Sequence, residues 1–262
     1  MWTPAVDARW RAAYRRAVRS AFATVPLYRE KWALEGRTDP VLVPGRTGAH
    51  GGAVTVEEAV RKMVDLVPLA GGADAPDPAR GLGRVLPRAR SSTRGTLVAV
   101  VDPAIRLPPT DLPRALRGCV LDVESLTGAT TSAARDEVLN TLRRNVPVLA
   151  VGPEAAIAAL LSALPGDLAG RVDRVPHRRV DELDGGPFGV IHDPLLGYLG
   201  HFDHCGRWHL DWRRVHARRT TGGLAFTVLG EHSPRLVDVL VAGGGPGRVE
   251  PCPRHGTPVV LT

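Results

Sequence analysis

The 262-residue chain has very little lysine and few cysteines, and it has no long apolar run. Its only two lysines are Lys31 and Lys62, so arginine carries nearly all of the positive charge. Three cysteines are too few for the disulfide framework of a small secreted protein. No stretch reaches the roughly 18 to 20 apolar residues that a membrane-spanning helix needs. These absences argue against a disulfide-stapled scaffold and predict no membrane partner.

The formal net charge of +7 raises the question of a nucleic-acid partner. The arginines are spread along the whole chain among Ala, Gly, Pro and Val, whereas a nucleic-acid footprint concentrates basic residues on one face. We therefore expect no specific nucleic-acid partner. The first 20 residues are arginine-rich and amphipathic and lack the apolar core of a secretory signal, which favours a cytoplasmic location.

Strands and helices alternate in the middle of the chain. Apolar residues at helical spacing predict an amphipathic helix over 7–22, before this region. Buried strands are then predicted at 96–103, 118–123 and 146–152, and helices at 132–145 and 153–164. This alternation predicts an α/β fold with a Rossmann-like parallel sheet covered by helices. No GxGxxG fingerprint opens a helix there, so the sequence does not support dinucleotide binding.

The pattern changes after about residue 186. Short β-rich runs follow one another, separated by glycine, proline and charged turns, which predicts a mainly antiparallel β region at the C-terminus. We divide the chain into two parts: residues 1–185 form a helical N-terminus plus an α/β layer, and residues 186–262 form the antiparallel β region. The two parts are expected to form one continuous domain.

Two short segments concentrate histidine and cysteine. "GHFDHCGRWHLDW" spans 200–212, and "EPCPRHGTP" spans 250–258. The residues of interest are His201, His204, Cys205 and His209 in the first segment and Cys252 and His255 in the second. Such clusters are typical of a metal site or an active site, but buried cysteines beside histidines on surface turns give the same pattern. The residues alone leave these readings open.

Four segments, in order along the chain, carry a family resemblance. "VPLYREKW" resembles a "VPfYre" opening, and "ARSSTRGT" (89–96) falls in the place of an "SSGTTG" phosphate loop. "GGLAFTVLGEHSPRLVDVLV" resembles "GelvlTtL…PliRYrtGD", and "EPCPRHG" resembles "pCpCGR". These segments belong to the phenylacetate–CoA ligase-type adenylate-forming enzymes, which are acyl-CoA synthetase-like. The resemblance implies a truncated form of the N-terminal domain of such enzymes.

The chain also departs from this family. Thr93 and Arg94 occupy the middle of the phosphate loop, where small residues let backbone N–H groups close around phosphate oxygens. Ser91, Ser92 and Arg94 are the remaining candidates there for binding the phosphate of a nucleotide or phosphopantetheine. The family's Thr-Glu pair, its ribose-binding acid and the adenylation lysine of its C-terminal subdomain have no counterpart in register. We therefore expect no conventional ATP-dependent adenylation, which leaves ATP and CoA doubtful as cofactors.

Members of the same family can hold a zinc ion near the last of these segments, with one Cys…His pair and one pair of cysteines. The matching residues here are Cys205, His209, Cys252 and His255. Two sulfurs and two imidazoles are a common closed tetrahedral ligand set. The resemblance therefore implies a structural Zn²⁺ that clamps the two ends of the antiparallel region.

Three functional hypotheses follow. The first is a truncated zinc-binding homologue of these ligases that acts on an acyl or aryl carboxylate derivative in bacterial specialised metabolism, with a small-molecule acyl or aryl substrate or a carrier protein as its partner. The second is a non-catalytic partner of an enzyme or carrier protein. The third is a zinc-dependent hydrolase or acyltransferase with an open metal site that activates a water. Its candidate catalytic residues are His201, His204, Asp203 and His192.

Overall fold

The structure, a computed structural model, describes residues 3–33, 49–72, 77–86, 95–122, 133–186, 188–231, 233–241 and 247–262. It is a mixed α/β protein with both parallel and antiparallel strands. Unit 1 comprises Met1–Pro76, Val180–Leu183 and His204–Thr262, and unit 2 comprises Asp77–Arg179 and Asp184–Asp203. This division differs from the boundary expected after residue 185, because the N-terminal helices belong with the C-terminal strands.

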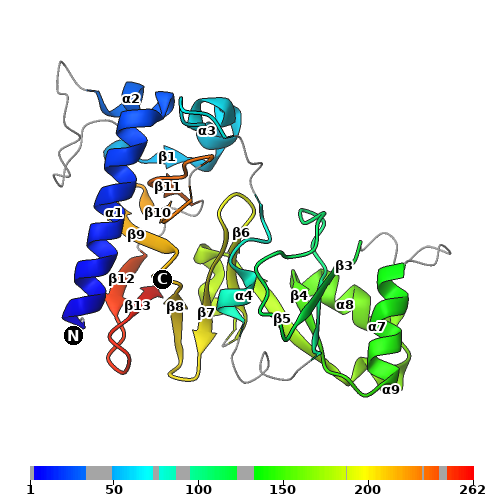
Figure 1. The fold of residues 1–262 in the computed structure, drawn as a ribbon. Coiled ribbons are helices and arrows are strands. Elements are labelled where there is room, and N and C mark those ends of the chain that lie inside the picture. Colours follow the sequence, from blue (N-terminus) through cyan, green and yellow to red (C-terminus); the bar gives the residue numbers. More distant parts are fainter. Residues whose placement is uncertain are drawn as a thin grey trace. The chain divides into compact units, whose positions relative to one another are not determined.

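Unit 2 contains the predicted parallel sheet. Its strands are β2 (Leu97–Val100), β3 (Arg117–Val120), β4 (Val148–Gly152), β5 (Val172–Arg178), β6 (Val190–Asp193) and β7 (Gly197–Asp203), in the order β7-β6-β5-β4-β2-β3. Its helices are α4 (Leu82–Val85), α7 (Ala133–Arg143), α8 (Glu154–Ala163) and α9 (Gly166–Ala169) (Figure 1). Strands β2 to β6 pair in parallel, and β7 is antiparallel to β6.

The run "LVAV" of β2 is apolar throughout because both faces of the sheet are covered. Leu97 and Ala99 pack in one apolar cluster together with residues of α7 and α8. Val98 and Val100 point to the opposite face and join a second cluster with residues of α4. All four side chains are fully buried. The central strand is therefore held from both sides, which makes the ends of this sheet a rigid place for functional residues.

One strand of the expected antiparallel region belongs to the parallel sheet instead. Val190 and Ile191 of β6 pair in parallel with His177 and Arg178 of β5. The sequence pattern does not reveal this, because a strand of only four residues looks the same in either pairing. The parallel sheet thus continues past residue 186, and the antiparallel pattern begins with β7.

Unit 1 combines N-terminal helices with antiparallel strands. The helices are α1 (Pro4–Thr24), α2 (Pro26–Trp32), η1 (Ala49–Gly52), α3 (Val56–Arg61) and η2 (Met63–Leu66), and η3 (Val180–Gly185) begins in this unit. The strands β1 (Val54–Thr55), β11 (Val239–Leu240), β10 (Gly223–Val228) and β9 (Val215–Thr220) form one sheet in this order, and β12 (Arg248–Pro251), β13 (Pro258–Leu261) and β8 (Arg207–Leu210) pair antiparallel. No helix in the described ranges has both the length and the apolar character of a membrane span.

Helix α1 is fixed to this unit by aromatic residues at helical spacing. The Trp10 indole N–H donates a hydrogen bond of 2.8 Å to the backbone oxygen of Val215. The rings of Trp10 and Tyr14 lie 4.3 and 4.0 Å from the imidazole of His216 in β9. Burial, partly offset by Asp238 and reinforced by Arg218, lowers the pKa of His216 to about 3. His216 is therefore held in its neutral form between two aromatic rings.

We expect His216 to make unit 1 sensitive to acid. In the unfolded chain an imidazole takes up a proton near pH 6.5, whereas folded His216 does so only near its pKa of about 3. Since the unfolded state binds more protons in this window, stability falls as the pH drops from about 6.5 towards 3, by about 1.4 kcal/mol per pH unit. His216→Phe removes this contribution, so urea unfolding at pH 7, 6 and 5 should show a shallower loss than the wild type. A constant difference between the two proteins across this range would contradict the assignment, and exposed His204→Gln serves as the control.

Candidate metal centre

The first half of the Cys/His group lies on a turn and the strand that follows it. Cys205 lies in the turn 204–206, where Gly206 adopts a φ of +77° that only glycine adopts without strain. His209 follows in β8 and is buried. The tight turn brings the thiol of Cys205 back over the start of the strand. Two potential ligands are therefore presented together.

The second half lies on the turn between β12 and β13. The amide of Cys252 donates to the oxygen of Thr257 at 2.8 Å, and the amide of Gly256 donates to the oxygen of Cys252 at 2.8 Å. Gly256 has a φ of +63°, and a Cβ there would lie 2.2 Å from Thr3 Oγ1, so this position requires glycine. Because β13 pairs antiparallel with β8, with Val259 opposite His209, the start of β13 lies beside His209 and brings the second turn close to the first pair of residues.

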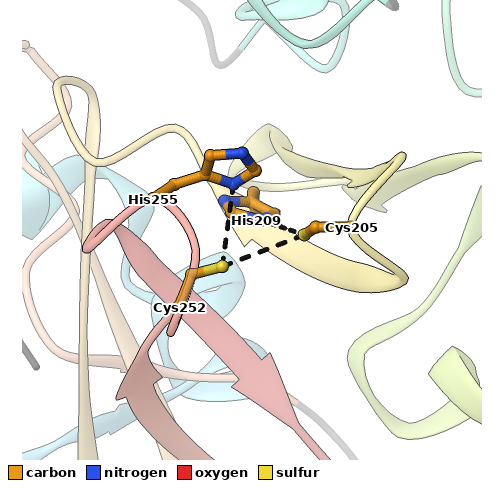
Figure 2. A group of neighbouring side chains, drawn as sticks. All are labelled: Cys205, His209, Cys252 and His255. Carbon is orange, nitrogen blue, oxygen red and sulfur yellow. Dashed lines mark hydrogen bonds between the residues drawn. The ribbon is translucent and has the colours of Figure 1, made fainter.

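The four predicted ligands come together at these turns, as Figure 2 shows. The Sγ atoms of Cys205 and Cys252 are 3.8 Å apart. Cys205 Sγ lies 3.0 Å from His209 Nε2, and Cys252 Sγ lies 3.6 Å from His255 Nδ1. All four potential ligand atoms lie within 4.8 Å of one another, so the group could hold a metal ion.

These separations can be compared with a zinc site. With Zn–S bonds of about 2.3 Å and Zn–N bonds of about 2.0 to 2.1 Å, tetrahedral geometry separates two sulfurs by about 3.8 Å and a sulfur from a nitrogen by about 3.6 Å. The observed distances of 3.8 Å between the sulfurs and 3.6 Å from Cys252 to His255 agree with these values. The contact of 3.0 Å between Cys205 and His209 is shorter, so this pair has to separate by about half an ångström to admit an ion.

The imidazole of His209 has a partner on its other side. Its Nδ1 lies 2.9 Å from the hydroxyl of Thr257, which leaves Nε2 directed at the thiol of Cys205. Metal-bound imidazoles commonly use their second ring nitrogen for such a hydrogen bond, which fixes the tautomer and the ring orientation. Sequence analysis missed Thr257, although its position two residues after His255 in the same turn was a usable signal.

The four catalytic candidates occupy different positions. His204 is exposed, and its ring lies 5.4 Å from that of His255 in an edge-on arrangement, next to the Cys/His group. His201 lies in β7 opposite Val190, and Asp203 ends the same strand; both are half-buried. His192 is buried in β6 and its Nε2 lies 2.9 Å from the backbone oxygen of Pro78. The neighbouring Asp193 instead accepts hydrogen bonds from the amides of Leu195 and Leu196, so the two adjacent residues have separate partners.

Unit 2 holds a second polar group that sequence analysis did not assemble. His177 Nδ1 lies 3.0 Å from Asp102 Oδ2, and its Nε2 lies 2.9 Å from the hydroxyl of Tyr198. The ring of His192 stacks on that of His177 with centroids 4.2 Å apart. Asp102 also accepts a hydrogen bond from the Ala104 amide. We call these four residues, Asp102, His177, His192 and Tyr198, the inner polar group.

Burial and hydrogen bonds together set the pKa values of this group. Burial raises the pKa of the Asp102 carboxyl, but the hydrogen bonds from His177 and the Ala104 amide outweigh it, so the pKa lies below its ordinary value. Burial lowers the pKa of His177, and the hydrogen bond with Asp102 offsets only part of this. Burial and then the neighbouring His177 lower the pKa of His192, and burial raises that of Tyr198. At neutral pH the group thus contains one carboxylate and two neutral imidazoles.

The other predicted binding residues, Ser91, Ser92 and Arg94, lie outside the described residues. The described part of the chain is a mixed α/β protein that has a Cys₂His₂ group in unit 1 and a buried Asp/His/Tyr group in unit 2. No family model and no curated protein sequence matches this chain.

Proposed function

We propose that the chain binds one Zn²⁺ through Cys205, His209, Cys252 and His255 and that this ion is structural. The observation that carries the proposal is the agreement of the Sγ–Sγ and Sγ–Nδ1 distances with tetrahedral S₂N₂ geometry. Thiolate and imidazole ligands favour zinc over the oxygen-preferring magnesium and calcium. Other first-row divalent metals bind such a set as well, so the choice of zinc also rests on the resemblance to zinc-holding ligases.

A structural role is favoured over a catalytic one because four side chains fill a tetrahedral shell. Catalytic zinc sites keep one position for water or substrate, with three protein ligands. Here Cys252 is fully buried and His209 nearly so, and the hydroxyl of Thr257 already orients His209. The ion would join the turn before β8 to the turn between β12 and β13. It would thus hold these two turns together.

Metal analysis tests this proposal. We expect about one zinc per chain in the purified protein by elemental analysis, and its loss in both Cys205→Ser and Cys252→Ser. Cys119→Ser is the matched control, since Cys119 is a buried cysteine of unit 2 outside the group. Loss of zinc in only one of the two variants would contradict a shared site, and zinc-free wild type prepared without chelators would remove the proposal.

We further propose that the protein is a relative of the phenylacetate–CoA ligase-type enzymes and handles an acyl or aryl carboxylate derivative without conventional ATP-dependent adenylation. The order of the four resembling segments, the mixed α/β fold and the Cys/His group at the last segment support this. A panel of acyl and aryl carboxylates with ATP should yield no AMP, while at least one of these acids or its thioester should raise the melting temperature. AMP formation would restore the full ligase reaction.

The non-catalytic alternative is distinguished by the same panel. If no carboxylate and no thioester shifts the melting temperature, acyl binding is wrong, and a carrier protein or enzyme becomes the ligand to test. Co-purification with a carrier protein from a bacterial host then decides whether the chain acts as a partner protein.

A further inference from the structure

The inner polar group lies at the end of the parallel sheet where ligands bind in open α/β folds. Asp102 follows β2 by two residues, and His177 is the second-last residue of β5. Strand β4, which lies between them, ends at Gly152, one residue before the row of Asp102 and His177. Strand β3 lies on one side of β2, and β4, the next strand in the chain, lies on its other side. The strand order therefore reverses at β2, and in open α/β sheets ligands bind at such a point.

The register of the strands explains why three distant residues meet. Val100 pairs with Val151, and Val151 with Val175, so Asp102 and His177 lie two residues further along the same row. His177 pairs with Val190, and His192 follows Val190 by two residues, which places both histidines on one face. The carboxylate and one nitrogen of each imidazole lie within 4.8 Å of one another.

The hydrogen bonds indicate which ring nitrogen of each histidine could bind a metal ion. The backbone oxygen of Pro78 can only accept, so His192 Nε2 carries the proton and the lone pair of this neutral ring is on Nδ1. His177 Nδ1 faces Asp102, and the hydroxyl of Tyr198, at its Nε2, can either donate or accept. A cation between Asp102 and His177 would take the place of the proton on Nδ1 of His177. The ring would then carry its proton on Nε2 and donate a hydrogen bond to the hydroxyl oxygen of Tyr198, so no net proton is released.

From this geometry we propose a second metal site, formed by Asp102, His177 and His192, that binds a divalent first-row transition-metal ion. Imidazole and carboxylate together suit Zn²⁺, Fe²⁺ or Mn²⁺. The Asp102–His177 distance of 3.0 Å is only a few tenths of an ångström below the separation of about 3.3 to 3.4 Å between ligands with bonds of 2.0 to 2.1 Å. The site lies within unit 2 and goes beyond the structural zinc proposed for unit 1.

The ligand set distinguishes this site from the Cys/His group in chemistry. Three protein ligands leave one tetrahedral position for a water or another small ligand, as in catalytic metal sites. Pro78 and Tyr198 would hold the outer nitrogens of the two imidazoles, which is the arrangement that fixes metal-bound histidines elsewhere. The side chains of Asp102 and His177 are each only 8% exposed, so the ion would be largely shielded from bulk solvent.

Cobalt binding to the full-length Cys205→Ser/Cys252→Ser variant tests the proposal. We expect about one equivalent of Co²⁺ with visible d–d bands and without the near-ultraviolet bands of thiolate-to-cobalt charge transfer. Adding Asp102→Asn or His192→Asn should abolish this binding, and adding Tyr198→Phe should weaken it by about 10- to 100-fold. His201→Gln, a histidine of the same unit outside the group, is the matched control and should leave binding unchanged.

Two results would overturn the proposal: no cobalt bound by the double-cysteine variant, or the same cobalt binding after Asp102→Asn. If the double-cysteine variant does not fold, wild type saturated with zinc at one equivalent is titrated with Co²⁺, and a second equivalent without thiolate bands is the expected result. The two proposals fail separately. Thiolate bands alone in cobalt-loaded wild type would leave only the Cys/His site, and d–d bands without thiolate bands would leave only the site in unit 2.

Discussion

Removal of the metal from the wild-type chain is expected to lower the free energy of unfolding of unit 1 by about 4 kcal/mol or more. A ligand that binds only the folded state adds about 4.1 kcal/mol when its free concentration is 1,000 times its Kd, and structural zinc commonly binds more tightly than that. The proposed ion would link the turn that carries Cys205 to the turn that carries Cys252. Urea unfolding with and without a chelator measures the difference.

Cys252→Ser should reproduce the effect of the chelator and make the protein insensitive to it. Cys252 is fully buried and lies close to both Cys205 and His255, so its loss removes one ligand and leaves a buried hydroxyl in its place. Cys119→Ser is the control: burial raises the pKa of this thiol to about 12, so it stays a neutral thiol in the core of unit 2. A wild type that unfolds identically with and without chelator would contradict a stabilising metal.

Asp238→Asn is expected to cost about 3 to 5 kcal/mol because it breaks a buried ion pair. The Asp238 side chain is fully buried and accepts a hydrogen bond of 2.8 Å from the guanidinium of Arg218. It also accepts hydrogen bonds from the hydroxyls of Tyr14 and Thr227. Burial lowers the pKa of Arg218, but Asp238 outweighs it and holds the pKa above its ordinary value. Without the carboxylate, the charge of Arg218 is left partly buried with no carboxylate to balance it.

Asparagine is the right replacement because residue 238 has a φ of 52°, a conformation that asparagine tolerates and alanine does not. The exposed pair Arg248–Glu250 is the matched control in the same unit, and Glu250→Gln should change stability by less than about 1 kcal/mol. The double variant Arg218→Met/Asp238→Asn should recover part of the loss, since it removes both charges. Equal losses in the single and double variants would show that the ion pair is not the cause.

If both metal proposals hold, the chain carries one ion in a closed site in unit 1 and one ion in an open site in unit 2. The closed set of two thiolates and two imidazoles would stabilise short turns, whereas the open set of one carboxylate and two imidazoles would leave a position for a small ligand. If the proposed relation to the ligases also holds, the open site would offer chemistry that does not require adenylation. The cobalt spectra and the carboxylate panel together test this combination.

Local patterns determined the parts of this protein that depend on neighbours in sequence. The apolar runs at β2 and β4 predicted buried parallel strands, because a strand covered on both faces has no polar alternation to interrupt it. The resemblance to the zinc-holding ligases implied the paired ligands, and their spacings of four and three residues are short enough for one turn of chain to present both side chains. The start of α3 is likewise local, because the hydroxyl of Thr55 accepts a hydrogen bond from the Glu58 amide and caps the helix.

Tertiary pairing decided the rest. The two-residue strand β1 forms only because β11, nearly 200 residues later, supplies its backbone partners. Asp102, His177 and His192 stand alone in the sequence, without the close spacing that marks a ligand set, and become neighbours only through the register of β2, β4, β5 and β6. The N-terminal helices join the C-terminal strands for the same reason: the contacts that define unit 1 are between segments whose order along the chain carries no sign of their pairing.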